Sequence, residues 1–355
     1  MTQRRRRLRR SDCSGPGLRR LRRGRGFAYV GEDGKPIDDQ EILERVRNLA
    51  IPPAWKEVWI CADPMGHLQA TGIDAAGRKQ YLYHPLWRER RDREKFEKMV
   101  RFAHQLPRLR RRVSRDVRGE EISKTRVLAC AVRLLDVGLF RIGGEEYAEE
   151  GGGLGLATVR KEHVAFKDGS MVFDYPAKGG IRRVQAIEEP LCANLIATLK
   201  RRRGGGPELL AYRDNGGWAG IRSEDINDYL KAQMGEDFSA KDFRTWNATV
   251  LAAVVLGAQG REAQTKAARK RAVDAAVRTV AELLGNTPAV ARRAYIDPRV
   301  IDRYQSGWTI GGALDRLGNI DIADGRTRVR LEAAVLDLIA EDAESPAVQL
   351  IDATE

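Results

Sequence analysis

The chain has 355 residues, a length typical of two domains, and 42% of its residues are hydrophobic. It holds no run of about 20 apolar residues, which excludes a membrane-spanning helix and predicts no membrane partner. The net charge of +13 favours a nucleic-acid partner. Most of it lies in residues 1–26, where eleven arginines and the single acid Asp12 give a charge of +10. The other 329 residues carry only +3. DNA affinity outside this segment must therefore come from local clusters of charge.

The first 26 residues predict a basic, disordered tail. Arginine runs with one acid are typical of arms that bind phosphates with a steep salt dependence. The alternative is an extension that only improves solubility. An arginine-rich start also resembles a transit peptide, but the segment lacks an apolar stripe and the apolar core of a signal peptide.

Cysteines and histidines give no pattern of a metal site. The four cysteines are far apart and form no C-x-x-C pair, which predicts reduced thiols in a cytoplasmic protein. The four histidines include no pair at metal-ligand spacing, so we expect no bound metal.

Residues 27–106 predict a small β-rich domain. We expect a helix over 38–49, three strands, and a strongly charged helix over 86–105. The strands are expected at 57–61, 67–72 and 80–84, separated by turns. The arginine-rich run after Pro107 predicts a linker over 107–120.

The remainder, residues 121–345, predicts a mainly helical domain with a small antiparallel sheet, followed by a tail over 346–355. A helix is expected over 121–138. Alternating runs at 162–167, 171–175 and 181–186 predict two hairpins, the second with Lys178 at its tip. Further helices are expected from 189 onward, with starts at Ser223 and Ser239. The fold class is α+β, in two lobes.

A late segment, residues 285–296, carries the most suggestive chemistry. Its Tyr295 lies among cations, and no histidine follows His163 anywhere in the chain. A tyrosine in such surroundings is a candidate nucleophile toward a phosphodiester. That reaction needs fixed cations on the nonbridging oxygens, a general acid for the leaving 5′ oxygen, and alignment of the nucleophile.

The chain offers such groups in separate segments. Ser239 and Asp242 predict a capping box, which places Lys241 and Arg244 in the first turns of a helix. Arg141 follows an apolar helix. Each residue alone is more often a solvated surface group, and a late tyrosine is usually a packing residue. Their combination carries more weight.

The combination of motifs resembles the type IB DNA topoisomerases, in particular the compact poxvirus-like form found in bacteria. The resemblance extends from about residue 17 to about residue 345. It rests on five motifs: Gly77-Arg78-Lys79-Gln80-Tyr81-Leu82-Tyr83, Phe140-Arg141-Ile142-Gly143, Gly155-Leu156-Ala157-Thr158, Lys241-Asp242-Phe243-Arg244-Thr245-Trp246, and Gly285-Asn286-Thr287-Pro288 with Tyr295.

The resemblance implies a role for each catalytic position. Tyr295 would attack the phosphodiester and form a 3′-phosphotyrosyl link. Arg141 and Arg244 would hold the scissile phosphate, and Lys178 would protonate the leaving 5′ oxygen. Lys167 is a competing lysine nearby. We prefer Lys178 because it lies on the second hairpin, between strands.

Two further residues complete the implied site. Asn286 would donate a hydrogen bond to a nonbridging oxygen, where poxvirus and eukaryotic members typically have histidine. Asparagine can donate through its amide but carries no charge. This substitution fits a hydrogen-bonding role and argues against proton transfer at that position. Lys241 would assist Lys178 and contact DNA.

The resemblance also implies DNA contacts elsewhere. Arg78 and Lys79 would contact phosphates, while Gln80, Tyr81 and Tyr83 would contact bases and sugars. Tyr147 matches a further DNA-contact position of the family. The alternative for the two strand tyrosines is packing, since they share one face of the strand.

These features predict an enzyme that relaxes supercoiled double-stranded DNA by cutting one strand, allowing rotation and resealing. We expect no ATP, cofactor or metal requirement, a monomer that closes around duplex DNA as a two-lobed clamp, and a place in the cytoplasm on the nucleoid. One alternative is a tyrosine recombinase, which would carry His-x-x-Arg where this chain has Lys241-x-x-Arg244. The other is a DNA-binding protein without catalysis.

Overall fold

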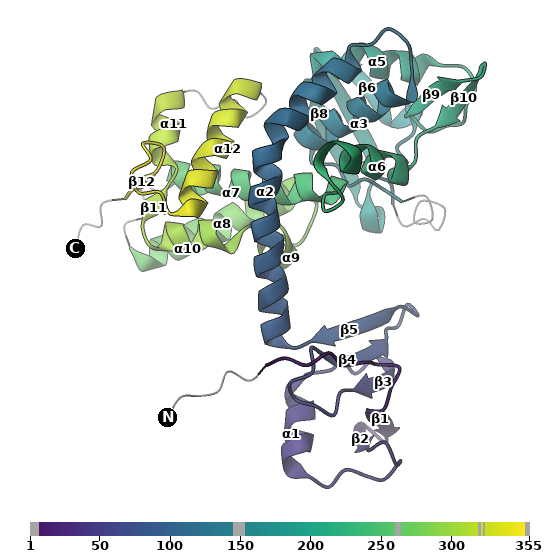
Figure 1. Cartoon of the computed structure of the whole chain (residues 1–355), viewed down its shortest axis with the longest axis vertical. Coiled ribbons are helices and arrows are strands. Elements are labelled where there is room, and N and C mark those ends of the chain that lie inside the picture. The colour runs from purple at the N-terminus through teal and green to yellow at the C-terminus, as the bar shows by residue number, and fades with distance from the viewer. Residues whose placement is uncertain are drawn as a thin grey trace. The chain divides into compact units, whose positions relative to one another are not determined.

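The computed structural model describes residues 7–144, 153–259, 263, 265–318, 321 and 324–351. The chain is an α+β protein with two compact units, of which the first ends at Glu97 and the second begins at Lys98. Helix α2 (Pro85–Val117) contributes residues to both units. Figure 1 labels the elements, and each unit is described below by itself.

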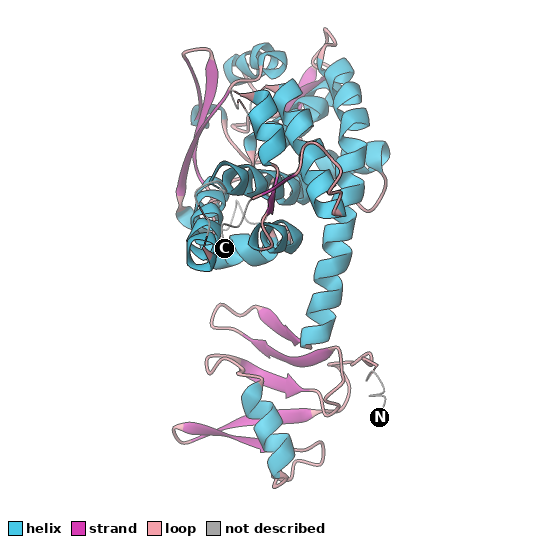
Figure 2. Cartoon of the chain, turned by 90° about the vertical axis from the view of Figure 1, so that its left-hand side faces the viewer, coloured by secondary structure: helices cyan, strands magenta, loops and turns pink. Residues whose placement is uncertain are grey.

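The first unit contains a five-stranded antiparallel sheet with the strand order β2-β1-β3-β4-β5. Its strands are β1 (Leu18–Arg23), β2 (Gly26–Val30), β3 (Lys56–Ile60), β4 (Leu68–Ile73) and β5 (Lys79–Tyr83). Helix α1 (Gln40–Asn48) lies against one face of this sheet (Figure 2). Val46 from α1 packs with Leu18, Val58 and Ile60 in the core, so the expected helix and three strands are present.

The prediction of a disordered tail is wrong for the described residues before 27. Residues 18–23 form β1 inside the sheet, and the backbone of Arg9 bonds to Met65 and His67. Arg20 is only 9% exposed and donates to the carbonyl oxygens of Ile51, Pro52 and Trp55 at 3.1, 3.0 and 2.7 Å. Hydrogen bonding to carbonyls thus accommodates an arginine at an inward position of the strand.

The linker expected at 107–120 is instead helical up to Val117. Helix α2 continues through Pro107 although proline lacks the N–H that an interior helical position donates. A buried apolar stripe at intervals of three and four residues stabilises it: Met99, Phe102, Leu106, Leu109, Val113 and Val117. The arginines between these positions concealed the stripe in the sequence.

The second unit is mainly helical. Helix α7 (Ala240–Gln259) is largely buried and packs against α3 (Lys124–Gly138), α8 (Lys266–Leu284), α10 (Pro298–Gln305) and α12 (Gly325–Ala340). The structure also describes α5 (Pro190–Arg201), α6 (Ser223–Met234), α9 (Pro288–Ala294) and α11 (Gly311–Leu317) in this unit. Figure 1 shows α8, α10 and α12 grouped around α7.

Three small sheets complete the second unit. The first consists of β6 (Val164–Lys167), β7 (Ser170–Pro176) and β8 (Arg182–Ile187) in that order, with the 3-10 helices η1 (Lys161–His163) before β6 and η2 (Lys178–Gly180) between β7 and β8. The others pair β9 (Ala211–Asp214) with β10 (Gly217–Gly220), and β11 (Trp308–Thr309) with β12 (Gln349–Leu350). Residues 349–350, expected in a tail, therefore pair with the body.

A buried ionic cluster joins three helices of this unit. Asp136 at the end of α3 is 2% exposed and accepts hydrogen bonds from Arg110 of α2 and Arg328 of α12, each at 2.9 Å. Arg110 also donates to Glu332 of α12 at 2.6 and 2.7 Å. This cluster fixes the end of α3, five residues before Arg141.

Candidate active site

The segment that carries Asn286 and Tyr295 is a short helix with a candidate residue just beyond each end. Helix α8 ends where Gly285 takes a left-handed conformation (φ +60°), and Thr287 caps α9. Asn286 precedes this cap, and Tyr295 is the residue that ends α9. Asn286 and Tyr295, nine residues apart, thus belong to one turn-and-helix unit.

Tyr295 is held in place from α7. Thr249 Oγ1 donates a hydrogen bond to the backbone carbonyl of Tyr295 at 3.2 Å, and the same hydroxyl accepts one from the N–H of Asp297 at 3.1 Å. Arg244 lies on the same helix, with its guanidinium carbon 5.4 Å from the centre of the Tyr295 ring. One buried helix therefore positions both the tyrosine and an arginine over it.

Three arginines from different elements meet at the end of α8. Arg183 of β8 donates to the carbonyl of Leu283 at 2.7 Å, Arg244 of α7 to that of Leu284 at 2.8 Å, and Arg141 to that of Gly285 at 2.9 Å. The last carbonyls of a helix lack intrahelical partners and carry partial negative charge. The end of α8 thus provides a set of acceptors that gathers three cations.

Arg141 is fixed on both sides. Its carbonyl accepts from the N–H of Leu156 at 2.9 Å, and a Cβ on Gly155 would lie 2.3 Å from the nitrogen of Gly143, so only glycine fits there. Arg141 Nη2 donates to Asn286 Oδ1 at 2.5 Å. The motifs around Arg141 and Gly155 are therefore one packed structure.

The amide nitrogen of Asn286 has no hydrogen-bond partner among the described residues, although that atom is buried. Because the oxygen of the same amide faces Arg141, the unpaired nitrogen is the donor. Leaving such a donor unpaired costs about 1–3 kcal/mol, so the site contains a donor available to an anionic oxygen.

The surrounding cations shift the ionisation of Tyr295. Partial burial raises the pKa of Tyr295, but the charges of Arg244, Lys241 and Arg141 outweigh burial and leave it below its ordinary value. Burial, and then repulsion from Arg141, lowers the pKa of Arg244 to about 10. The site therefore favours a negative charge on the tyrosine or on a bound ligand.

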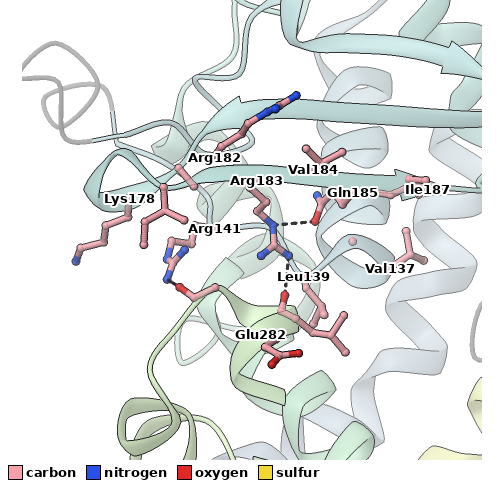
Figure 3. A pocket seen from close by; sticks show the side chains of 16 residues that line it. Val137, Leu139, Arg141, Lys178, Arg182, Arg183, Val184, Gln185, Ile187 and Glu282 are labelled. Atoms are coloured by element: carbon pink, nitrogen blue, oxygen red, sulfur yellow. Dashed lines mark hydrogen bonds between the residues drawn. The ribbon is translucent and has the colours of Figure 1, made fainter. Parts of the chain in front are cut away.

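Lys178 lies in η2, at the tip of the hairpin as expected, and is exposed. Within the described part of the chain, its amine makes no hydrogen bond or ion pair. Lys178, Arg141 and Arg183 line a pocket of about 370 Å³, shown in Figure 3. Lys167 lies on β6, outside the residues that line this pocket.

Lys241 is exposed in the first turn of α7. The predicted capping box is half present, because Asp242 accepts from the N–H of Ser239 at 2.8 Å while also pairing with Lys98 at 2.7 Å. Sequence analysis did not predict that Arg183 and Thr249 contribute to the site. Neither residue belongs to a motif, and their contacts with the site arise only because segments distant in the sequence pack together.

The candidate DNA contacts of the first unit lie on and beside β5. Arg78 and Gln80 both donate to Asp74, at 2.9 Å each, so their polar ends are occupied. Tyr81 and Tyr83 share a face and stack with ring centres 6.2 Å apart, and Tyr81 is 46% exposed. Lys79 lies 5.9 Å from the Tyr81 ring. Tyr147 falls outside the described residues.

Comparison with known proteins covers most of the chain. Residues 84–309 match the family model described as the catalytic core of eukaryotic DNA topoisomerase I, and residues 26–74 match the N-terminal domain of bacterial DNA topoisomerase IB. The first match spans more than half of the chain. The chain belongs to the type IB DNA topoisomerases.

Individual relatives agree with this membership. DNA topoisomerase 1B of Acanthamoeba polyphaga mimivirus is 28% identical over 295 residues, which are 82% of this chain and 88% of the viral enzyme. DNA topoisomerase 1B of Vaccinia virus (strain Copenhagen) is 19% identical over 75% of this chain and 82% of its own length. DNA topoisomerase 1 of Candidozyma auris is 29% identical over 44% of this chain but only 20% of its own length.

Membership in the topoisomerase family makes this chain an enzyme that acts on DNA. The described residues contain no group of three histidine, cysteine, aspartate or glutamate side chains that could hold a metal ion. None of the described helices is both long and apolar enough to cross a membrane.

Proposed function

We propose that this topoisomerase relaxes supercoiled duplex DNA by cutting one strand through Tyr295. The observation that carries the proposal is the arrangement around this tyrosine. Arg244 lies 5.4 Å from its ring, and Arg141 and Arg183 reach the same helix end as Arg244. Such an arrangement suits an attacking tyrosinate and a phosphate with growing negative charge.

In the proposed cleavage step, Tyr295 Oη attacks the phosphorus and loses its proton to solvent. A bond forms between Oη and phosphorus, and the bond from phosphorus to the 5′ oxygen breaks. Lys178 gives a proton to that oxygen, so a free 5′-hydroxyl and a 3′-phosphotyrosine result. The lowered pKa of Tyr295 reduces the cost of forming the nucleophile.

The arginines and Asn286 would stabilise the phosphate. Arg141 and Arg244 would each donate to nonbridging oxygens, as the planar guanidinium group does well. The unpaired amide nitrogen of Asn286 would donate to the same group. Lys241 would add positive charge at the start of α7. These roles need no metal.

The phosphotyrosine would conserve the energy of the phosphodiester, so the free 5′-hydroxyl can reverse the reaction without ATP. Rotation of the cut strand about the intact one between the two steps releases supercoils. We propose that one chain suffices, with DNA contacts from Lys79, Tyr81 and Tyr83, and from Arg78 and Gln80 once they leave Asp74. Tyr147 and a place on the nucleoid belong to the same proposal.

Relaxation of negatively supercoiled plasmid in EDTA, without ATP, tests this function. Wild-type protein should relax the plasmid, and Tyr295→Phe should not. Tyr304→Phe is a matched control, because the buried Tyr304 hydroxyl has no hydrogen-bond partner in the described structure. Strand exchange between specific sites without relaxation would identify a recombinase instead.

A further inference from the structure

Arg183 is placed where it connects two parts of the proposed site. It lies on β8, the strand that follows Lys178, and its Nη2 donates to the carbonyl of Leu283 at the end of α8. Two residues beyond that carbonyl the chain reaches Gly285, which accepts from Arg141, and then Asn286. Arg183 thus links the hairpin of the proposed general acid to the segment of the proposed phosphate ligands.

The side chain of Arg183 is itself held in a defined direction. Its Nε donates to Gln185 Oε1 at 2.9 Å, so two edges of the guanidinium group are engaged at once. Burial is the main cause that lowers its pKa, and Tyr175 opposes that effect. No carboxylate within the described residues pairs with it. A half-buried cation held only by neutral acceptors suggests a positional requirement rather than a surface salt bridge.

Lys178 needs such support, because its amine has no partner of its own in the described structure and its hairpin turn is exposed. A general acid must lie within hydrogen-bond reach of the leaving oxygen, and an error of about 1 Å can cost roughly 100-fold in rate. Figure 3 shows Arg183 between the hairpin and the end of α8, with Arg182 directed away from Arg141.

We propose that Arg183 is a positioning residue for DNA cleavage, which sets the hairpin of Lys178 against the end of α8 so that Lys178 reaches the leaving 5′ oxygen. This inference rests on the proposed function. Arg183 need not touch DNA, and it would act through the proton transfer from Lys178.

The proposal predicts a defect confined to leaving-group protonation. The test compares single-turnover cleavage of a normal strand with cleavage of a strand whose scissile 5′ bridging oxygen is replaced by sulfur. In the second substrate the bond from phosphorus to sulfur breaks and a thiolate leaves without a proton. Arg183→Ala should cut the normal strand roughly 10- to 100-fold more slowly than wild type. It should cut the sulfur strand at about the wild-type rate, with DNA affinity unchanged.

Two variants complete the design. Arg182→Ala removes the same charge one residue away, where the arginine pairs with Asp174 inside the hairpin at 2.6 and 2.8 Å, and it should leave both rates near wild type. Arg183→Lys keeps the charge but not the planar fork, so it should behave like Arg183→Ala. It also supplies a second variant if Arg183→Ala does not fold.

The outcomes separate the two proposals. Equal slowing on both substrates, no slowing at all, or full activity of Arg183→Lys would overturn the positioning role. If Lys178→Ala is also slow on the sulfur strand, the role of Lys178 as general acid is wrong. If wild-type protein forms no covalent adduct on either strand, the proposed function itself fails.

Discussion

At the scale of single residues, Asn286 gives the sharpest test of how the phosphate is held. Its amide nitrogen is buried and has no partner among the described residues, as expected of a donor that binds an oxygen of the substrate. Asn286→Ala should slow single-turnover cleavage roughly 100-fold, the lower end of the range seen on removing one donor from an anion-stabilising site. Asn286→His, which retains a donor, should be tolerated.

The matched control is Asn194→Ala, because Asn194 is exposed on α5. It should cleave at the wild-type rate. Full activity of Asn286→Ala would remove this residue from the proposed phosphate site.

Tyr295 should titrate below an ordinary tyrosine, whose pKa is about 10. The lowered pKa means that more tyrosinate is present at any given pH, so cleavage should rise with pH and level off earlier than for an unperturbed tyrosine. Ultraviolet difference titration of wild type against Tyr295→Phe measures this value. Arg244→Gln should move it upward, since the charge of Arg244 is the largest cause that lowers it.

The sequence predicted the site better than it predicted the contacts that support it. Arg141, Arg244, Asn286 and Tyr295 come together as the motifs suggested, and Lys178 lies at a hairpin tip. Their catalytic roles stay predictions. Arg183 was missed because an arginine in an exposed-looking strand carries no local signal of its partner 100 residues away.

At the scale of elements, the predictions from sequence were wrong where arginines are interspersed among the buried positions of a strand or helix. Strands β3, β4 and β5 follow alternation and turns that can be read locally. Strand β1 and the second half of α2 are harder to predict, because their buried positions lie among arginines. The long arginine stems pack on the protein while the charged ends reach carbonyls or solvent.

The ionic cluster of α2, α3 and α12 should be required for stability. Asp136→Asn would leave Arg110 and Arg328 without their shared carboxylate and should lower the free energy of unfolding by about 3–5 kcal/mol. Urea unfolding measures the loss. Asp228→Asn, at a side chain that is 73% exposed, is the control and should change it by no more than about 0.5 kcal/mol.

The same cluster predicts a pH dependence. Burial acts to raise the pKa of Asp136, but Arg328 and Arg110 outweigh it and hold the pKa well below the ordinary range. A depressed folded-state pKa stabilises the fold above the unfolded value near 4, and this contribution is lost as the pH falls below it. Wild type should therefore lose more stability than Asp136→Asn between pH 5 and about pH 2. Equal losses would contradict the pairing.

At the scale of the whole molecule, the family match and the arrangement of the site both point to a DNA topoisomerase. The catalytic-core match ends at residue 309, while α12 lies beyond it and supplies Arg328 and Glu332 to the ionic cluster around Asp136. The division of the chain near residues 97–98 differs from the boundary at 106 expected from the sequence, because α2 runs through that region as one helix.

The most direct test of the account is to identify the residue that becomes linked to DNA. Protein trapped on a nicked duplex with detergent, digested with protease and analysed by mass spectrometry should yield a 3′-phosphonucleotide bound to the peptide that contains Tyr295. Tyr304→Phe should give the same adduct and Tyr295→Phe none. An adduct on any other residue, or its persistence in Tyr295→Phe, would contradict the central claim.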